Sequence, residues 1–288
     1  REDVMAITDL YSEKGYAFAE ARPDMRKPQS GEEVIDLTYR INKGELVYIN
    51  RINTRGNKRT RDNVIRREIR LAEGGVFNSK ALRESSQALQ RLQFFEEVNI
   101  TPEPTIDPTR MNVNIEVKER STGTFSIGAG YSSVDSIIVM GSISENNFMG
   151  RGDRLSLSAN IGGSSSRYNL GYTNPHVNDS ALSFGVDLFN TEREYDDYTK
   201  ESLGGGLRLG YPLIEKWRIF GNYSYSDTDL SDISDDASWI IKESAKVEVT
   251  SSMEVSLVRD TRNRTFAATE GSRHVLSAQH AGGVFGGD

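Results

Sequence analysis

Residues 154–161 read RLSLSANI, and along them polar and apolar side chains alternate without interruption. Leu155, Leu157, Ala159 and Ile161 fall on one face of an extended chain, because successive side chains of a β-strand point to opposite faces. The other face holds arginine, serine and asparagine. The stretch therefore predicts a β-strand with one apolar and one polar face, close to the length that crosses a membrane.

The same two-residue period recurs through the second half of the chain, in about nine segments. They cover residues 124–131, 137–144, 154–161, 168–173, 182–188, 203–210, 217–225, 246–257 and 274–279. Such strands build either a transmembrane β-barrel or a soluble all-β domain. Tyrosine and tryptophan near the strand ends favour the barrel, in which aromatic residues lie at the membrane–water interface. Under this interpretation Phe125, Leu157, Phe184 and Leu207 face outward, towards lipid.

Composition changes near residue 121 and excludes several classes of function. Of the 26 glycines, 6 precede residue 121 and 20 follow it. With 35 Lys and Arg against 42 Asp and Glu, the net charge of −7 argues against a nucleic-acid-binding protein. The absence of cysteine excludes disulfides, thiol catalysis and zinc fingers. No run of about 18 apolar residues occurs, so no transmembrane helix is predicted.

Residues 1–120 instead predict a mixture of helices and strands. Apolar residues recur at helical spacing over residues 62–73, and Asn78 or Ser79 is suited to cap a second helix. The strand-like runs around this pair are residues 47–55, 97–102 and 111–118. This order predicts a compact module of two helices on a three-stranded sheet.

The residues before this module repeat the end of the same order. They predict a helix at residues 2–14 and strands at residues 17–25 and 34–41. We interpret this as an internal repeat whose first copy lacks its beginning.

Several short motifs have a catalytic or binding appearance that their context does not support. Asp227, Asp229 and residues 232–236 lack the glycine and distal glutamate of an EF-hand loop. Residues 204–206 are three glycines with no following Lys-Ser/Thr, so they are not a phosphate-binding loop. We identify no nucleophile, metal set or cofactor loop, and expect no enzyme, no cofactor and no bound metal.

Three longer motifs occur in a fixed order. Residues 47–100 read VYINRINTRGNKRTRDNVIRREIRLAEGGVFNSKALRESSQALQRLQFFEEVNI, residues 145–155 read ENNFMGRGDRL, and residues 259–273 read RDTRNRTFAATEGSR. The first resembles a polypeptide-transport-associated (POTRA) module. The other two resemble a second-strand turn and a later periplasmic turn of barrels that POTRA modules precede. Over essentially the whole chain, the sequence resembles the POTRA-plus-barrel family of the bacterial outer-membrane β-barrel assembly machine.

The resemblance implies a fold class of α+β POTRA modules (β-α-α-β-β) followed by a transmembrane antiparallel β-barrel. Residues 1–43 would be the C-terminal part of one POTRA module, residues 44–120 a complete module next to the barrel, and residues 121–288 the N-terminal barrel strands. The modules would lie in the periplasm and the barrel in the bacterial outer membrane. The family's barrel has roughly sixteen strands, so we expect only the N-terminal part of one, and a fragment.

The implied function is the folding and insertion of β-barrel proteins into the outer membrane, by edge-strand templating and a lateral barrel seam. The implied partners are unfolded outer-membrane protein clients, accessory assembly lipoproteins and outer-membrane lipid, but no nucleic acid. Two alternatives stay open: a related POTRA-barrel transporter that secretes a partner protein, and a passive outer-membrane pore.

Three candidate sites follow. The first is the first barrel strand as a client-pairing edge, whose glycines would weaken side-chain packing at the seam. The second is a POTRA edge strand, on which a client could add by β-augmentation. The third is a charged helix face, interpreted either as a solvated surface or as a docking surface for a partner. The residues are Gly123, Phe125, Ile127, Gly128, Ala129, Gly130 and Tyr131 for the first; Glu97, Val98, Asn99, Ile100 and Thr101 for the second; and Arg66, Arg67, Glu68 and Arg70 for the third.

Overall fold

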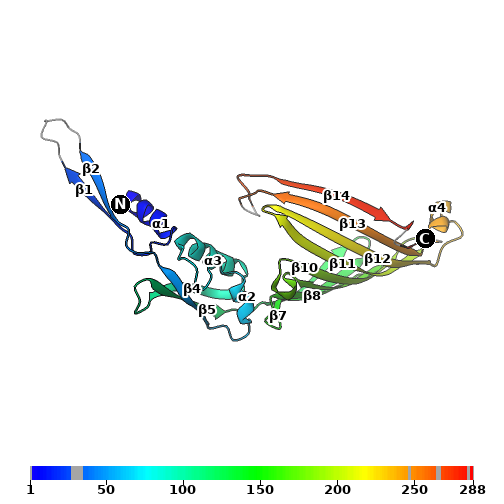
Figure 1. The fold of residues 1–288 in the computed structure, drawn as a ribbon. Helices are drawn as coiled ribbons and strands as arrows, with labels where there is room; N and C mark the ends of the chain where they lie inside the picture. The colour runs from blue at the N-terminus through cyan, green and yellow to red at the C-terminus, as the bar shows by residue number, and fades with distance from the viewer. Residues whose placement is uncertain (1, 27–34, 246–247, 264–266, 284–285, 288) are drawn as a thin grey trace. The chain divides into compact units, whose positions relative to one another are not determined.

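The chain divides into two compact units, Arg1–Ser121 and Thr122–Asp288. The structure, a computed structural model, describes residues 2–26, 35–245, 248–263, 267–283 and 286–287. Figure 1 shows helices and short strands in the first unit and long strands in the second. Among the described residues, no helix is long and apolar enough to cross a membrane.

The first unit contains the predicted module of two helices and three strands. Its sheet has the order β3-β5-β4, with β5 parallel to β3 and antiparallel to β4. Val64, Ile65 and Leu89 of the two helices pack with Val113 and Ile115 of β5 in a buried core. The elements are β3 (Tyr48–Arg55), α2 (Asp62–Arg66), α3 (Ser79–Arg91), β4 (Phe95–Pro104) and β5 (Arg110–Glu119).

The prediction of a helix over residues 62–73 was too long, because α2 ends at Arg66. The following residues turn back to pair with β3. The Gly74 N–H donates to the Ile49 carbonyl at 2.7 Å, and the Phe77 N–H donates to the Val47 carbonyl at 2.8 Å. These long-range backbone hydrogen bonds outweigh the local helical pattern.

Helix α3 begins as predicted, with Asn78 as its N-cap. The Asn78 side-chain oxygen accepts a hydrogen bond from the Ala81 N–H at 2.8 Å, which satisfies a free donor of the first turn. The Asn78 amide nitrogen also donates to the Glu13 carbonyl at 2.8 Å. One side chain therefore both starts α3 and joins it to the segment that precedes the module.

That preceding segment has the predicted helix and two strands. They are α1 (Glu2–Ser12), β1 (Glu20–Arg26) and β2 (Asp36–Asn42), and the two strands pair antiparallel. The predicted second strand starts at Val34, which lies outside the described residues. The order helix–strand–strand recurs in α3, β4 and β5.

The second unit is one antiparallel sheet in which each strand pairs with the next along the chain. Its order is β14-β13-β12-β11-β10-β9-β8-β7-β6, which confirms the predicted nine-strand sheet. Residues 246–247, at the start of one predicted strand, lie outside the described residues. The strands are β6 (Gly123–Ser132), β7 (Ser136–Phe148), β8 (Asp153–Ile161), β9 (Ser165–Asn174), β10 (Ser183–Glu194), β11 (Thr199–Ile214), β12 (Trp217–Ser231), β13 (Val249–Asp260) and β14 (Arg273–Ala281), with short helices η1 (Val177–Asp179) and α4 (Trp239–Ser244) between strands.

The register of the sheet collects apolar side chains on one face and polar side chains on the other. One apolar row crosses five strands at Phe125, Ile143, Leu157, Leu170 and Leu188. The adjacent row on the other face is Thr124, Ser144, Ser156, Gly171 and Asp187.

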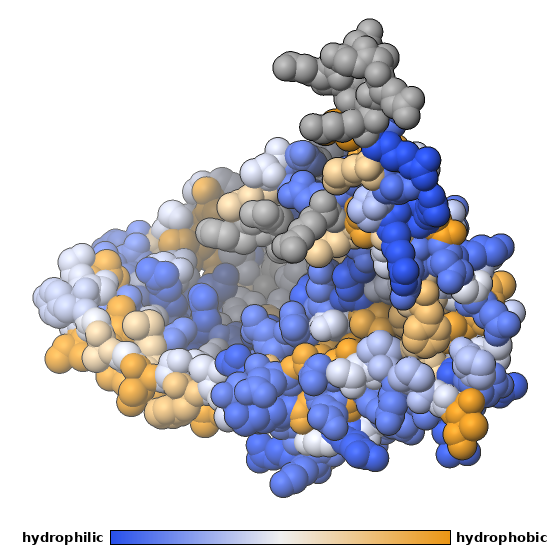
Figure 2. Space-filling view, turned by 90° about the vertical axis from the view of Figure 1, so that its left-hand side faces the viewer, coloured by the Kyte–Doolittle hydropathy of each residue, from blue (hydrophilic) through white to orange (hydrophobic). Residues whose placement is uncertain are grey.

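The apolar face is not covered by other described parts of the chain. Phe125 is 68% exposed, Leu157 50% and Leu207 45%, and Phe184 is half-buried. In Figure 2, apolar residues in orange gather along the lower left border of the view, beside hydrophilic residues in blue. A face this apolar and this exposed is typical of contact with lipid.

Candidate functional site

The predicted client-pairing strand is the edge strand β6. It pairs with β7 on one side and has no other partner among the described strands. The Asn146 N–H donates to the Thr122 carbonyl at 3.2 Å, so the pair Thr122–Asn146 is hydrogen-bonded. Because hydrogen-bonded and non-hydrogen-bonded pairs alternate along an antiparallel ladder, even-numbered residues of β6 bond to β7. The N–H and C=O groups of Gly123, Phe125, Ile127, Ala129 and Tyr131 therefore point to the free edge.

The beginning of β6 is held by the last residues of β7, which lead into the turn before β8. The Thr122 hydroxyl hydrogen-bonds to the Glu145 carboxylate, which also accepts the Asn147 N–H at 3.0 Å. The Asn147 side chain in turn accepts the Gly152 N–H at 2.8 Å. The 145–155 motif covers the end of β7, this turn and the start of β8, so the motif holds one end of the edge strand.

The interior glycines of β6 have room around them. A Cβ atom at Gly128 would meet only the Met140 Cε atom, at 3.7 Å, and one at Gly130 would meet nothing within 4 Å. No close contact requires glycine at these two positions. Larger side chains would fit at both positions, so glycine leaves β6 with less side-chain packing than the space allows.

The second candidate edge is β4, at one border of the three-stranded sheet. The Thr105 N–H donates to the Arg110 carbonyl of the adjoining hairpin at 3.2 Å, so odd-numbered residues bond to β5 and even-numbered residues face the free edge. Val98 and Ile100 present N–H donors there, but Pro102 and Pro104 have none. Glu97, Asn99 and Thr101 are exposed, while Val98 and Ile100 pack partly against the core. The edge thus offers donors over only half of its length.

The third candidate, the charged face of α2 and the turn after it, is largely occupied by contacts within the module. Arg66 forms ion pairs with Asp62 and Glu73 and donates to the Ile52 carbonyl at 3.0 Å. The Arg70 Nη1 atom lies 2.6 Å from a carboxylate oxygen of Glu84. Arg66 and Arg70 remain accessible, with side chains 45% and 60% exposed.

Arg67 and Glu68 are more enclosed, with side chains 11% and 21% exposed. Burial raises the pKa of Glu68, and the charges of Arg67, Arg91 and Arg70 partly counter that rise. This face therefore places a poorly solvated carboxyl group among arginines. Among the described residues, no group of three histidines or carboxylates is arranged to bind a metal ion.

Comparison with known proteins identifies the family. A family model described as an Omp85 superfamily domain matches residues 147–288, and a POTRA model described as a surface antigen variable number repeat matches residues 47–120. The chain belongs to the Omp85 superfamily. The match covers both units and confirms the fold class of POTRA module and barrel strands.

Named relatives of this Omp85 chain are assembly factors. It is 37% identical over 286 residues to "Outer membrane protein assembly factor BamA" of Nitratidesulfovibrio vulgaris, covering 99% of this chain and 36% of that protein. It is 30% identical to the protein of the same name from Neorickettsia risticii, covering 100% of this chain and 39% of that protein. The chain thus spans little more than a third of the relatives it matches.

A solved structure shares the fold. The crystal structure of BamA from Haemophilus ducreyi lacking POTRA domains 1–3 superposes with a TM-score of 0.79 at 21% identity, over 96% of this chain and 56% of that chain. The Omp85 chain accordingly belongs in the bacterial outer membrane, with its POTRA module in the periplasm. Strand β6 therefore starts at the periplasmic side.

The polar face of the Omp85 sheet is linked across strands by side chains. The Arg208 Nε atom lies 2.6 Å from an Asp187 carboxylate oxygen, and Arg208 also donates to the Thr173 hydroxyl at 3.2 Å. The hydroxyl groups of Ser224 and Ser252 are 2.7 Å apart. A polar face of this kind is typical of the side of a barrel wall that faces the water-filled interior of the barrel.

The 145–155 motif is recognisable in the sequence, but the contacts of its side chains are not. Asp153, only 2% exposed, accepts a hydrogen bond from the Tyr172 hydroxyl at 2.9 Å. The burial of an acidic residue at a strand end could not be anticipated, because its partner is 19 residues away. The one available signal was the unusual density of glycine and polar residues in the motif.

Proposed function

We propose that this chain takes part in the folding and insertion of β-barrel proteins into the bacterial outer membrane, and that clients pair with the free edge of β6. The proposal is supported by the names of the relatives, which are outer-membrane protein assembly factors. Its single strongest structural support is the row of five outward backbone donors on β6, with no partner among the described strands.

The mechanism needs no bond chemistry. An unfolded client has unpaired backbone groups, and each costs several kcal/mol in lipid. The outward N–H and C=O groups of β6 can pair with a client strand while it enters the membrane. Since backbone groups form this pairing, clients of many sequences can use the same edge.

The other candidate sites have supporting places in this mechanism. Val98 and Ile100 at the β4 edge would hold a client segment in the periplasm before it reaches β6. Arg66 and Arg70, with the more enclosed Arg67 and Glu68, would form part of a docking surface for accessory assembly lipoproteins. The apolar face around Phe125 and Leu157 would contact outer-membrane lipid. Residues 1–43 would belong to a second, partly included POTRA module.

Proline substitution distinguishes the free side of β6 from its bonded side. Ile127→Pro removes an outward donor, whereas Ser126→Pro removes a donor to β7. We expect Ile127→Pro to slow insertion of a client barrel into liposomes, scored by protease protection, while the protein keeps its heat-resistant folded form on gels. Ile127→Val retains the donor and should insert clients at the wild-type rate.

Ser126→Pro is the matched control, because it should weaken the folded form itself. If folded Ile127→Pro protein inserts clients as fast as wild type, pairing at β6 is refuted. In that case Ile100→Pro tests the β4 edge by the same assay. Insertion unaffected by either change would favour a transporter or a passive pore.

A further inference from the structure

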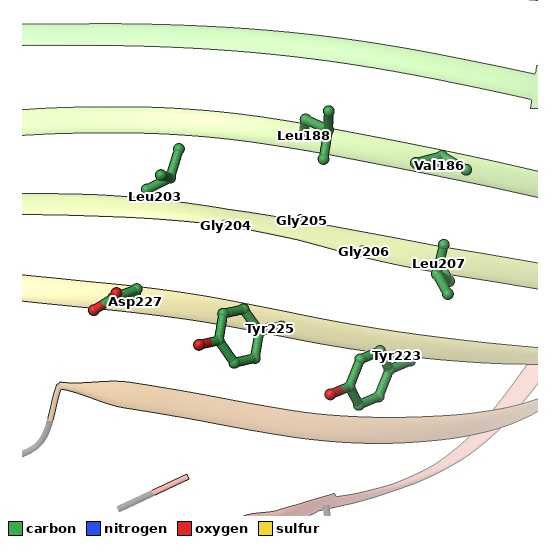
Figure 3. A pocket seen from close by; sticks show the side chains of 10 residues that line it. All are labelled: Val186, Leu188, Leu203, Gly204, Gly205, Gly206, Leu207, Tyr223, Tyr225 and Asp227. Atoms are coloured by element: carbon green, nitrogen blue, oxygen red, sulfur yellow. The ribbon is translucent and has the colours of Figure 1, made fainter. Parts of the chain in front are cut away.

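Gly205, the middle one of three consecutive glycines on β11, opens a groove on the apolar face of the sheet. Gly205 lies on that face between Leu188 of β10 and Tyr225 of β12, which are its neighbours in register. Leu203 and Leu207 of β11 border it along the strand. Figure 3 shows these side chains surrounding a stretch of bare backbone at residues 204–206. The cavity measures about 540 Å³.

The floor of the groove is fixed backbone. The register of β11 with both neighbouring strands is continuous through residues 204–206. On the opposite face, a Cβ atom at Gly204 would lie 2.6 Å from the Phe189 ring, so that ring backs the floor. The walls are accessible, with Leu188 51% exposed and Leu203 59% exposed. The groove is therefore a preformed hollow bordered by apolar side chains.

The groove lies in the outer half of the apolar band. Strand β12 runs in the same direction as β6, so its end at Ser231 is on the side of the wall opposite the periplasmic start. Towards that end, the row after Leu203 is Glu192, Glu201 and Asp229. Towards the periplasm, apolar positions continue through Leu209 and Tyr211. The end of the groove at Asp227, which is the end away from the periplasm, thus lies where the wall meets the outer head-group layer.

We propose that this groove binds one hydrocarbon chain of an outer-leaflet lipid. The groove is continuous with the lipid-facing surface, so hydrocarbon is the medium that surrounds it. A peptide strand is a poor occupant, because the backbone groups of the floor already bond to β10 and β12. A lipid chain needs only shape and apolar walls, which Leu188, Leu207 and the Tyr225 ring provide.

Photo-crosslinking tests the proposal without any measurement of client insertion. The intact protein is reconstituted in phosphatidylethanolamine/phosphatidylglycerol vesicles that contain a phospholipid with a diazirine in one acyl chain. After irradiation, adducts are mapped by peptide mass spectrometry. We expect adducts to concentrate on Leu188, Leu203 and Tyr225, compared with Phe125 and Ile143 elsewhere on the same face.

Two variants should remove this concentration by different routes. Gly205→Leu fills the groove, although its Cβ would lie 2.9 Å from Leu188 and could disturb the fold. Tyr225→Ala removes one wall and leaves the glycine backbone unchanged. Gly221→Leu is the matched control, because this glycine is on the same face of β12 with nothing within 4 Å of a Cβ. All variants are first checked for the heat-resistant folded form.

In folded Tyr225→Ala and Gly205→Leu protein, we expect adducts at Leu188 and Leu203 to be lost. In Gly221→Leu protein, we expect the same adducts to remain at the wild-type level. Adducts spread evenly over the apolar face of the wild type would mean ordinary surrounding lipid and would overturn the proposal. Unchanged adducts in folded Tyr225→Ala would overturn it as well. The result does not depend on β6, so it stands or fails separately from the proposed function.

Discussion

The hydroxyl of Thr122, directly before β6, and the carboxylate of Glu145 on β7 hydrogen-bond to each other at the start of the β6–β7 ladder. The contact fixes only the periplasmic end of β6, where the Asn146 N–H also bonds to the Thr122 carbonyl. Among the described residues, no side-chain hydrogen bond joins the rest of the strand to β7; backbone hydrogen bonds and apolar cross-strand pairs such as Phe125 and Ile143 do so. Opening of β6 would therefore pivot on the contact between Thr122 and Glu145.

Breaking this contact should loosen the start of the edge strand. In Thr122→Val protein, we expect amide hydrogens near Ser126 to exchange faster, because the hydroxyl donor to Glu145 is lost while the side-chain volume is kept. Exchange at Leu157, on β8, should be unchanged. Hydrogen–deuterium exchange with peptide mass spectrometry measures both. Equal exchange in variant and wild type would show that backbone bonds alone hold the strand.

Alanine at the open glycines should strengthen β6 and slow client insertion. Gly128→Ala and Gly130→Ala fit without close contact, and each should stabilise the strand by roughly 0.5–1 kcal/mol. If a weak edge is needed, liposome insertion of a client should slow in the double variant. Gly141→Ala on β7 has equal space and serves as the control, with insertion unaffected. If the double variant inserts the client at the wild-type rate, the two glycines are not needed for insertion.

The POTRA core should depend strongly on Leu89. This side chain is 0% exposed, so Leu89→Ala should cost about 2–5 kcal/mol of unfolding free energy. Leu92 packs only partly against the same core, so Leu92→Ala should cost less. Urea unfolding of residues 1–121, followed by circular dichroism, gives both values. Equal losses would mean that Leu92 is as enclosed as Leu89.

Two glycines in the module share a positive φ but differ in their surroundings. Gly74 has φ +79° and nothing within 4 Å of a Cβ, whereas Gly56 has φ +91° and a Cβ there would lie 1.9 Å from the Val117 carbonyl oxygen. Gly74→Ala should cost about 1–2 kcal/mol from backbone strain alone. Gly56→Ala should cost more, since it adds a steric clash. Their urea midpoints provide the test, and the reverse order would contradict it.

Stability of the module should depend on pH through Glu119. Burial alone would raise the pKa of Glu119, but hydrogen bonds from the N–H groups of Thr60, Arg59 and Lys58 and from the Thr60 side chain lower it. A carboxyl whose folded pKa is lowered adds stability above its unfolded pKa, near 4.3. That stability is lost as the pH falls through the folded pKa. Glu119→Gln should therefore be less stable than wild type at pH 7.

The difference between Glu119→Gln and wild type should shrink below pH 4, where the wild-type carboxyl is protonated. Thermal melts of residues 1–121 from pH 3 to 7 measure this difference. A constant gap across that range would assign the loss to the shape of the amide rather than to charge.

Much of the fold was predictable from the sequence, because alternation and helical spacing are local. The strands of the second unit follow from their two-residue period, and Asn78 as a helix-capping residue predicts the start of α3. The end of α2 was not predictable, since Gly74 and Phe77 pair with a strand more than 20 residues earlier. The local preference for helix is weak, so these long-range hydrogen bonds determine where α2 ends.

The two candidate strands were predictable from the sequence, but which of their backbone groups point to the free edge was not. Which residues of β6 face outward depends on the bond between Thr122 and Asn146, which no pattern in the sequence reveals. The same holds for Pro102 and Pro104, whose missing donors lie on the free side only because Thr105 bonds to Arg110. The charged face at Arg66 was visible in the sequence, but its ion pairs within the module were not.

The double role of Asn78 has a mechanical consequence. Its side chain both caps α3 and bonds to Glu13 at the end of α1, and Arg83 of α3 forms a further ion pair with Glu13 at 3.1 Å. A force applied to α1 is therefore passed to α3 directly through these bonds, and not only through the intervening chain. A displacement of α1 would therefore be passed directly to the first turn of α3 within the first unit.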